Sequence, residues 1–128
     1  MRSDRGSMAV AMSAAVAVVA VASVAVAGLG VLYSARTQAQ TGADAAALAA
    51  AVATYPPAAS VSPVAAARDI AGENGAVVLR CSCPRDPTFR ARVVEVVTAI
   101  RVDVPVFGEW LVHGSSRAEF DPVRWLGR

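Results

Sequence analysis

The sequence has few of the side chains from which catalytic and metal sites are built. Its 128 residues include one histidine, His113, and two cysteines, Cys81 and Cys83. A zinc site takes four ligands, most often cysteine and histidine. A catalytic nucleophile needs a base and a third group that orients the base. Because neither set is evident around a lone histidine, we expect no catalytic residues, no metal and no cofactor, and we predict that the protein is not an enzyme.

Lysine is absent, and all 12 basic side chains are arginines scattered among ten acidic residues, for a net charge of +2. Nucleic acids and anionic surfaces are bound by basic side chains gathered on one face. The sequence contains no such cluster and no glycine-rich loop of the kind that holds phosphate groups. We therefore expect no nucleic-acid partner and no small-molecule substrate.

Charge is also absent from a long stretch near the N-terminus. Residues 8–33 contain no charged side chain and no proline. An α-helix needs about 20 apolar residues to cross a bilayer. The eight valines and two leucines of this stretch contribute about −4 kcal/mol to insertion. The pattern predicts a single transmembrane helix at residues 8–33, preceded by a short segment at residues 1–7.

Flanking charges predict the orientation of this helix. Arg2 and Arg5 precede the apolar stretch, whereas Arg36 on the far side is followed by Asp44. Basic residues are retained preferentially on the cytoplasmic side of a membrane. We therefore expect a single-pass protein of the cell membrane, with a cytoplasmic N-terminus and an extracytoplasmic C-terminal domain.

The same stretch can also be interpreted as a secretory signal peptide. It has a basic start, an apolar middle and a small-residue motif at Ala25-Val26-Ala27, just before Gly28. Cleavage after Ala27 would release a small secreted binding protein. We favour a retained anchor, because the apolar stretch exceeds the seven to fifteen residues typical of a signal peptide. Both interpretations place the rest of the chain outside the cytoplasm.

After the apolar stretch the pattern remains helical, because residues 34–54 are rich in alanine and contain no proline. Arg36, Gln40 and Asp44 recur every fourth residue and predict a solvated stripe, which leaves Leu48 and the alanines to pack on the domain. Small side chains also let helices approach closely. The candidate helix-packing residues are Ala39, Ala43, Ala46, Ala47 and Ala50.

A proline-rich linker at residues 55–63 ends this helical rod. A small α+β domain is expected to follow at residues 64–120. Its first element is a short helix that begins at Pro63, is capped by Ser62, and ends near Glu73 before Asn74-Gly75. Residues 76–82 form a short β-branched run bounded by Gly75 and Pro84, which predicts a strand.

The remaining elements are predicted to be strands. Residues 93–97 are β-branched, and residues 100–104 alternate strictly between apolar and charged side chains. One face would carry Ile100, Val102, Val104 and Val106, and the other Arg101 and Asp103. A last strand is expected at residues 115–120, after breaks at Gly108 and Gly114, followed by an irregular tail at residues 121–128. Together these features predict an α+β fold in which a long rod precedes a helix on a small antiparallel sheet.

The two cysteines are separated by one residue, which places both side chains on the same face of an extended strand. A bridge between such neighbours is geometrically demanding and closes too small a loop to stabilise the fold strongly. A disulfide within the chain, two free thiols, and a bond to another chain all remain open at this level. Cys81 and Cys83 are thus a possible disulfide pair.

Several segments resemble the TadE/TadG-like proteins of the tight-adherence (Flp) pilus system, particularly its short actinobacterial members. The segments are Asp4-Arg5-Gly6-Ser7 before the apolar helix, residues 35–40 leading into residues 43–51, and residues 65–76 leading into residues 77–81. This resemblance implies a cell-envelope protein with a pilin-like fold and no enzymatic activity.

The resemblance further implies a minor, pseudopilin-like component of a pilus or secretion assembly. Such a component would act through membrane-helix packing and contacts with other pilin-like or pilus-assembly proteins. It also implies processing after Gly6, so that Ser7 begins the mature chain. Two positions depart from the pattern: Ala11 stands where the mature pilin carries glutamate, and Ala65 stands where related chains often have a cysteine.

Overall fold

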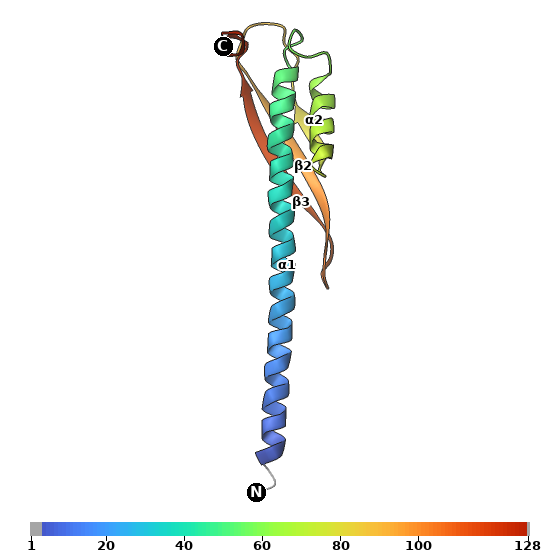
Figure 1. The fold of residues 1–128 in the computed structure, drawn as a ribbon. Coiled ribbons are helices and arrows are strands. Elements are labelled where there is room, and N and C mark those ends of the chain that lie inside the picture. The colour runs from blue at the N-terminus through green and yellow to red at the C-terminus, as the bar shows by residue number, and fades with distance from the viewer. Residues whose placement is uncertain (1–3, 128) are drawn as a thin grey trace.

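The computed structural model describes residues 4–127 and shows one very long helix with a small sheet against its second half (Figure 1). Arg2 and the other residues at positions 1–3, together with residue 128, lie outside the described part. The elements in chain order are α1 (Asp4–Ala53), α2 (Pro63–Glu73), β1 (Val77–Ser82), β2 (Arg92–Val104), β3 (Gly108–Phe120) and α3 (Pro122–Leu126). The predicted α+β architecture is confirmed.

Helix α1 runs for 50 residues without interruption, so the predicted membrane span and the predicted rod are one continuous helix. The absence of proline and the abundance of alanine account for its continuity. The helix ends where the Thr54 hydroxyl donates a hydrogen bond to the Ala51 carbonyl at 2.6 Å. Pro56 and Pro57 then prevent a further helical turn, because they lack the backbone donor.

Helix α2 has the expected signals at both ends. The Ser62 side chain accepts a hydrogen bond from the backbone of Ala65 at 3.2 Å, and Pro63 occupies the first turn. At the other end Gly75 adopts a φ of 70°, the left-handed conformation that glycine adopts most readily. The predicted start and end of this helix are confirmed.

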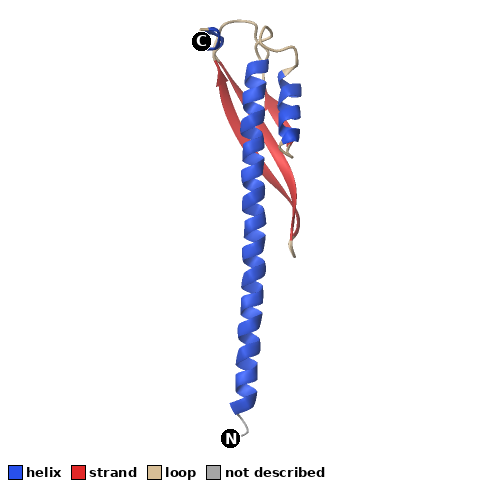
Figure 2. Cartoon of the chain, in the orientation of Figure 1, coloured by secondary structure: helices blue, strands red, loops and turns tan. Residues whose placement is uncertain are grey.

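The three strands form one antiparallel sheet in the order β1-β2-β3. Both α1 and α2 lie against the same face of this sheet (Figure 2), and the opposite face is open. Ile100 and Val104 are buried under the helices, whereas Arg101 and Asp103 are exposed. The predicted alternation between a buried and a wet face is therefore confirmed for residues 100–104.

The β2–β3 hairpin differs from its prediction in three ways. The strand predicted at residues 115–120 is only the second half of β3, which begins at Gly108 and passes through Gly114 without a break. Gly108 has a φ of 78° and starts the strand after the turn. Val106 does not lie on the buried face, because it sits in the turn and is 86% exposed.

The C-terminal tail is not irregular throughout, because residues 122–126 form the short helix α3. The Asp121 carboxylate accepts hydrogen bonds from the backbone of Val123 at 3.0 Å and of Arg124 at 3.4 Å. Pro122 occupies the first helical position, where its missing donor costs nothing. An acidic cap followed by proline is a recognisable helix start, so this local signal was missed in the sequence.

The core is built largely from small side chains. Alanines of α1 and α2 pack on Val94 and Val96 of β2, all of them buried. At the end of the sheet farthest from the N-terminus, Tyr55 lies between Phe89 and Phe120, with ring centroids 5.9 and 6.3 Å away. A core of alanine and valine brings helix and sheet unusually close together, which matters for the site described next.

Candidate functional site

The first part of α1 stands clear of the domain. Every residue from Gly6 to Ala27 is exposed, and we call residues 6–27 the anchor segment. At 1.5 Å per residue this segment is about 33 Å long, close to the roughly 30 Å hydrocarbon core of a bilayer. Within residues 4–127, α1 alone is long and apolar enough to cross a membrane, a test that a signal sequence also passes.

The bare stretch ends before the predicted span of residues 8–33 does. Gly28 is buried, Val31 and Leu32 are half-buried, and Ala35 is buried again. These residues face the strands, not open space, because the tip of the β2–β3 hairpin reaches down along α1 to this level. We call residues 28–53 the packed segment.

The five candidate helix-packing alanines all lie in the packed segment. Ala39, Ala43, Ala46, Ala47 and Ala50 are each 0% exposed. The elements packed against α1 are β2, β3 and α2. The structure therefore places these side chains against the chain's own domain.

Glycine makes the closest part of this contact possible. A β-carbon built on Gly114 would lie 2.3 Å from the Ala39 carbonyl oxygen, and one built on Gly42 would lie 3.0 Å from the β-carbon of Ala76. Backbone thus approaches backbone where α1 crosses β3. Gly114 serves close packing and is not a strand break, which corrects its interpretation from sequence.

Hydrogen bonds of polar side chains also join α1 to β2 and β3 near this contact. The buried Thr98 hydroxyl donates a hydrogen bond to the Ala39 carbonyl at 2.8 Å. The Gln40 amide donates to the Ser115 carbonyl at 2.8 Å and accepts from the Ser115 backbone at 3.4 Å. Gln40 is exposed, as the predicted solvated stripe requires, and its side chain also binds the edge strand β3.

Two other helix positions can be compared with their predictions. Arg36 and Asp44 are exposed, as the solvated stripe requires. Leu48, by contrast, is 64% exposed and does not pack on the domain. The helix turns its alanines inward because only they allow so close an approach to the sheet.

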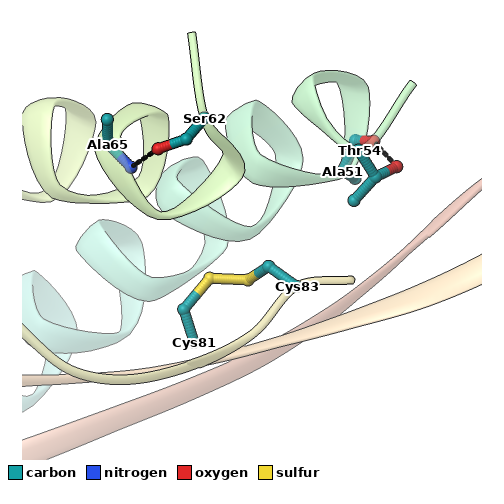
Figure 3. The surroundings of a disulfide bond; sticks show 6 residues. All are labelled: Ala51, Thr54, Ser62, Ala65, Cys81 and Cys83. Atoms are coloured by element: carbon teal, nitrogen blue, oxygen red, sulfur yellow. Dashed lines mark hydrogen bonds between the residues drawn. A yellow bond between two sulfur atoms is a disulfide. The ribbon is translucent and has the colours of Figure 1, made fainter. Parts of the chain in front are cut away.

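Cys81 and Cys83 are joined by a disulfide, with α-carbons 5.4 Å apart. Cys81 belongs to β1 and Cys83 follows the end of that strand. Both are partly buried against the core, and Figure 3 shows the bridge beside the ends of the helices that carry Thr54 and Ala65. The bridge constrains the start of the loop after β1, where both cysteines pack against the core.

Arg92 is a structural residue that the sequence patterns did not single out. It is 8% exposed, and its guanidinium donates hydrogen bonds to the carbonyls of Thr54, Asp86, Thr88 and Arg90. The guanidinium also lies 5.9 Å from the centre of the Tyr55 ring. In the same loop, hydrogen bonds from Thr88 lower the pKa of the Asp86 carboxyl. Arg92 thereby ties the end of α1 to the loop before β2.

The open face of the sheet carries paired charges. Glu95 in β2 binds Arg80 of β1 at 2.9 Å and Arg117 of β3 at 3.0 Å. His113 lies exposed on β3, opposite Ala99 of β2. In residues 4–127 no group of three or more histidine, cysteine or acidic side chains is placed to hold a metal ion.

Comparison with known protein families gives a match that lies within α1. Residues 6–53 match a family described as "Putative Flp pilus-assembly TadE/G-like". Along its long helix the chain is similar to this family. The match confirms the resemblance seen in this part of the sequence, to a family that is named for Flp pilus assembly.

The TadE/G-like match covers less than half of the chain and stops before the linker. It therefore includes the anchor segment and the packed segment, but none of the strands. No curated protein and no solved structure matches the chain.

Proposed function

We propose that the chain is a pilin-like minor component of a Flp/Tad-type pilus or secretion assembly, without enzymatic activity. It acts through packing of its membrane helix and through protein contacts. The observation that carries this proposal is the division of α1. In the helix that matches the TadE/G-like family, the apolar anchor segment is exposed, whereas the packed segment is covered by the chain's own domain.

The bare half is suited to an apolar environment. The hydroxyls of Ser13 and Ser23 are satisfied inside the helix, because Ser13 donates to the Ala9 carbonyl and Ser23 to the Val19 carbonyl, both at 2.8 Å. Unsatisfied polar groups are costly in hydrocarbon, so this arrangement favours insertion. Small side chains along the segment also permit close approach by another membrane helix.

We propose an extracytoplasmic position for the sheet domain and a cytoplasmic N-terminus. The arginines ahead of the anchor segment favour this orientation. The Cys81–Cys83 bridge also supports it, because disulfides persist in oxidising compartments and are rare in the cytoplasm. An alkaline phosphatase fused after the C-terminus should be active in a bacterial host, and an inactive fusion would overturn the orientation.

Complementation of a deletion strain tests the assembly role. His113→Ala should restore pilus assembly or secretion as fully as the unchanged chain, because His113 is exposed on the open face and takes part in no proposed chemistry. Loss of function in a His113→Ala protein that stays folded and membrane-bound would contradict the non-enzymatic role.

Two processing sites are compatible with the helix. Gly6 and Ser7 lie at its start, where a prepilin-type cut would retain the whole anchor segment. Ala27 and Gly28 lie where the bare stretch ends, so a cut between them would leave the buried contacts of residues 28–53 intact.

This second cut would yield a small secreted binding protein, which is the alternative function. Mass spectrometry of the mature N-terminus separates the two. A chain that starts at Met1 or Ser7 supports the anchored component, whereas a start at Gly28 supports the secreted protein.

A further inference from the structure

The β2–β3 hairpin ends in an unusual turn. The Phe107 backbone donates a hydrogen bond to the Val104 carbonyl at 2.9 Å, with Pro105 and Val106 between them. Val106 has a φ of 73°. Proline followed by a residue of positive φ is the pattern of a type II turn, and glycine or asparagine normally fills the second of these positions. A β-branched residue there is strained, so something other than turn stability accounts for Val106.

The tip is also apolar and exposed. Val106 is 86% exposed, Phe107 60% and Trp110 49%. Asp103 and Glu109 lie opposite each other beside the turn, and Glu109 pairs with Arg101 at 3.2 Å on the open sheet face. The end of the hairpin therefore presents a small hydrophobic surface, which we call the hairpin tip (residues 105–110), with charges directed away from the helix.

The hairpin tip lies beside α1 at the end of the anchor segment. A β-carbon built on Gly28 would lie 3.4 Å from Val104 and 3.9 Å from Phe107. A groove of about 320 Å³ between α1 and the hairpin is lined by Ala25, Leu29 and Leu32 on one side and by Phe107 and Trp110 on the other. The hairpin tip thus meets α1 where the anchor segment ends, and the exposed apolar surfaces of the two are continuous.

A residue at the end of a membrane-spanning helix lies at the boundary between acyl chains and headgroups. Tryptophan is enriched at this boundary because its ring is apolar and its N–H is polar. The Trp110 N–H already donates to the Phe107 carbonyl at 3.2 Å, so the ring can enter an apolar layer without an unsatisfied donor. Exposed apolar side chains at this depth are then covered by lipid.

We propose that the hairpin tip inserts into the bilayer that the anchor segment spans, at the interface between lipid and water on the extracytoplasmic side. Val106, Phe107 and Trp110 form the inserted surface, and the occupant of the adjoining groove is a phospholipid acyl chain. This inference rests on the proposed membrane anchoring. A second attachment beside the helix fixes the tilt and rotation of the sheet domain, and so determines which face it offers to other assembly proteins.

Fluorescence of the full chain in phospholipid vesicles tests this insertion. The chain has two tryptophans, so Trp125→Phe leaves Trp110 as the only emitter. In vesicles of phosphatidylcholine and phosphatidylglycerol brominated near the headgroup, Trp110 should lose more than half of its emission. It should also be shielded from aqueous acrylamide.

The matched control is Trp110→Phe, which leaves Trp125 in α3, at the end of the sheet opposite the hairpin tip (Figure 1). Trp125 should be quenched by acrylamide and not by brominated lipid. Equal lipid quenching of the two tryptophans would overturn the insertion.

A second variant separates insertion from folding. Val106→Gly suits the positive φ and removes the most exposed apolar side chain of the tip, so the thermal midpoint should not fall. Lipid quenching of Trp110 should nevertheless drop by at least half, measured in the Trp125→Phe background. Unchanged quenching would contradict the assignment of Val106 to the inserted surface.

Two further outcomes distinguish the causes of failure. If the chain floats with vesicles after alkaline washing but Trp110 is shielded from acrylamide without lipid quenching, a protein surface covers the tip and the insertion is wrong while the anchor stands. If the unprocessed chain does not float with vesicles, both the membrane anchor and the insertion are wrong.

Discussion

The two halves of α1 are both rich in alanine, yet only the second lies against the rest of the domain. In the anchor segment, valines such as Val18 and Val21 are 68% and 71% exposed. In the packed segment, alanines such as Ala43 and Ala47 are 0% exposed. Burial in the packed segment comes from the strands that lie against it, not from a more apolar sequence. The same kind of helix thus serves as a membrane anchor in one half and as the core of a domain in the other.

The difference also determines how much volume each half tolerates. Gly114 allows the β3 backbone to approach the α1 backbone at Ala39, so nothing larger fits between them. Side chains of the anchor segment are exposed, so their size is limited chiefly by what the membrane or a partner helix accepts. Substitutions at matched positions should therefore have very different effects in the two halves.

The largest effect is expected from a charge in the anchor segment. Val21→Arg should add about 2.5 to 3.5 kcal/mol to the free energy of insertion, which cancels most of the estimated gain. Membrane fractionation should find the variant soluble or degraded. Leu48→Arg is the control, because Leu48 is exposed on the packed half and should fractionate normally. Normal fractionation of Val21→Arg would show that this segment is not the anchor.

The second effect concerns the crossing of α1 and β3. Gly114→Ala should destabilise the domain by about 3 kcal/mol, because its new methyl group meets the Ala39 carbonyl and forces helix and strand apart. Urea unfolding in detergent micelles, with protease protection as the readout, measures the loss of stability. Gly30→Ala in α1 is the control. Its new methyl group meets nothing within 4 Å, so the urea midpoint should be unchanged or slightly higher. Equal stability of the two variants would contradict this contact.

A third prediction compares equal enlargements in the two halves. Ala47→Leu should destabilise the domain by about 2 kcal/mol, since its site is fully buried between α1 and its neighbours. Ala17→Leu, in the exposed anchor segment, should leave the unfolding midpoint unchanged. If complementation nevertheless fails for Ala17→Leu, the bare half packs against another membrane helix. A stable Ala47→Leu domain would show that the sheet does not cover this face.

The smallest effect is expected at the disulfide. Replacing Cys81 and Cys83 together with serine should lower stability by about 1.5 kcal/mol, the chain-entropy value for so short a loop. Reduction of the unchanged chain with dithiothreitol should produce the same shift in thermal midpoint. A reductant that shifts the unchanged chain and the double variant equally would mean that the bridge does not account for the change.

Local patterns were sufficient for much of the fold. The uncharged stretch at residues 8–33 predicted an apolar helix, and Ser62, Pro63 and Gly75 predicted both ends of α2. The alternation at residues 100–104 predicted which side of β2 is buried. Each of these features depends on neighbours within a few residues along the chain, so the sequence alone carries the information.

The errors have a common physical cause. Gly114 was interpreted as a break, Leu48 was assigned to the wrong side of α1, and the hydrogen bonds of the exposed Gln40 were not foreseen. These outcomes depend on how α1 lies against strands far away in sequence, as in the contacts of Gly114 with Ala39 and of Gln40 with Ser115. Asp121-Pro122 is different, because its capping signal is local and was simply overlooked.

By itself the sequence determined that a long apolar helix leads into a small α+β domain. Only the tertiary structure decided that the fully exposed part of that helix ends at Ala27. It also decided which alanines are fully buried, at 0% exposure. Helical propensity and hydropathy are properties of the local chain. The end of the bare stretch, in contrast, is set by how far the β2–β3 hairpin reaches along α1, and that depends on the register of strands paired across the sheet.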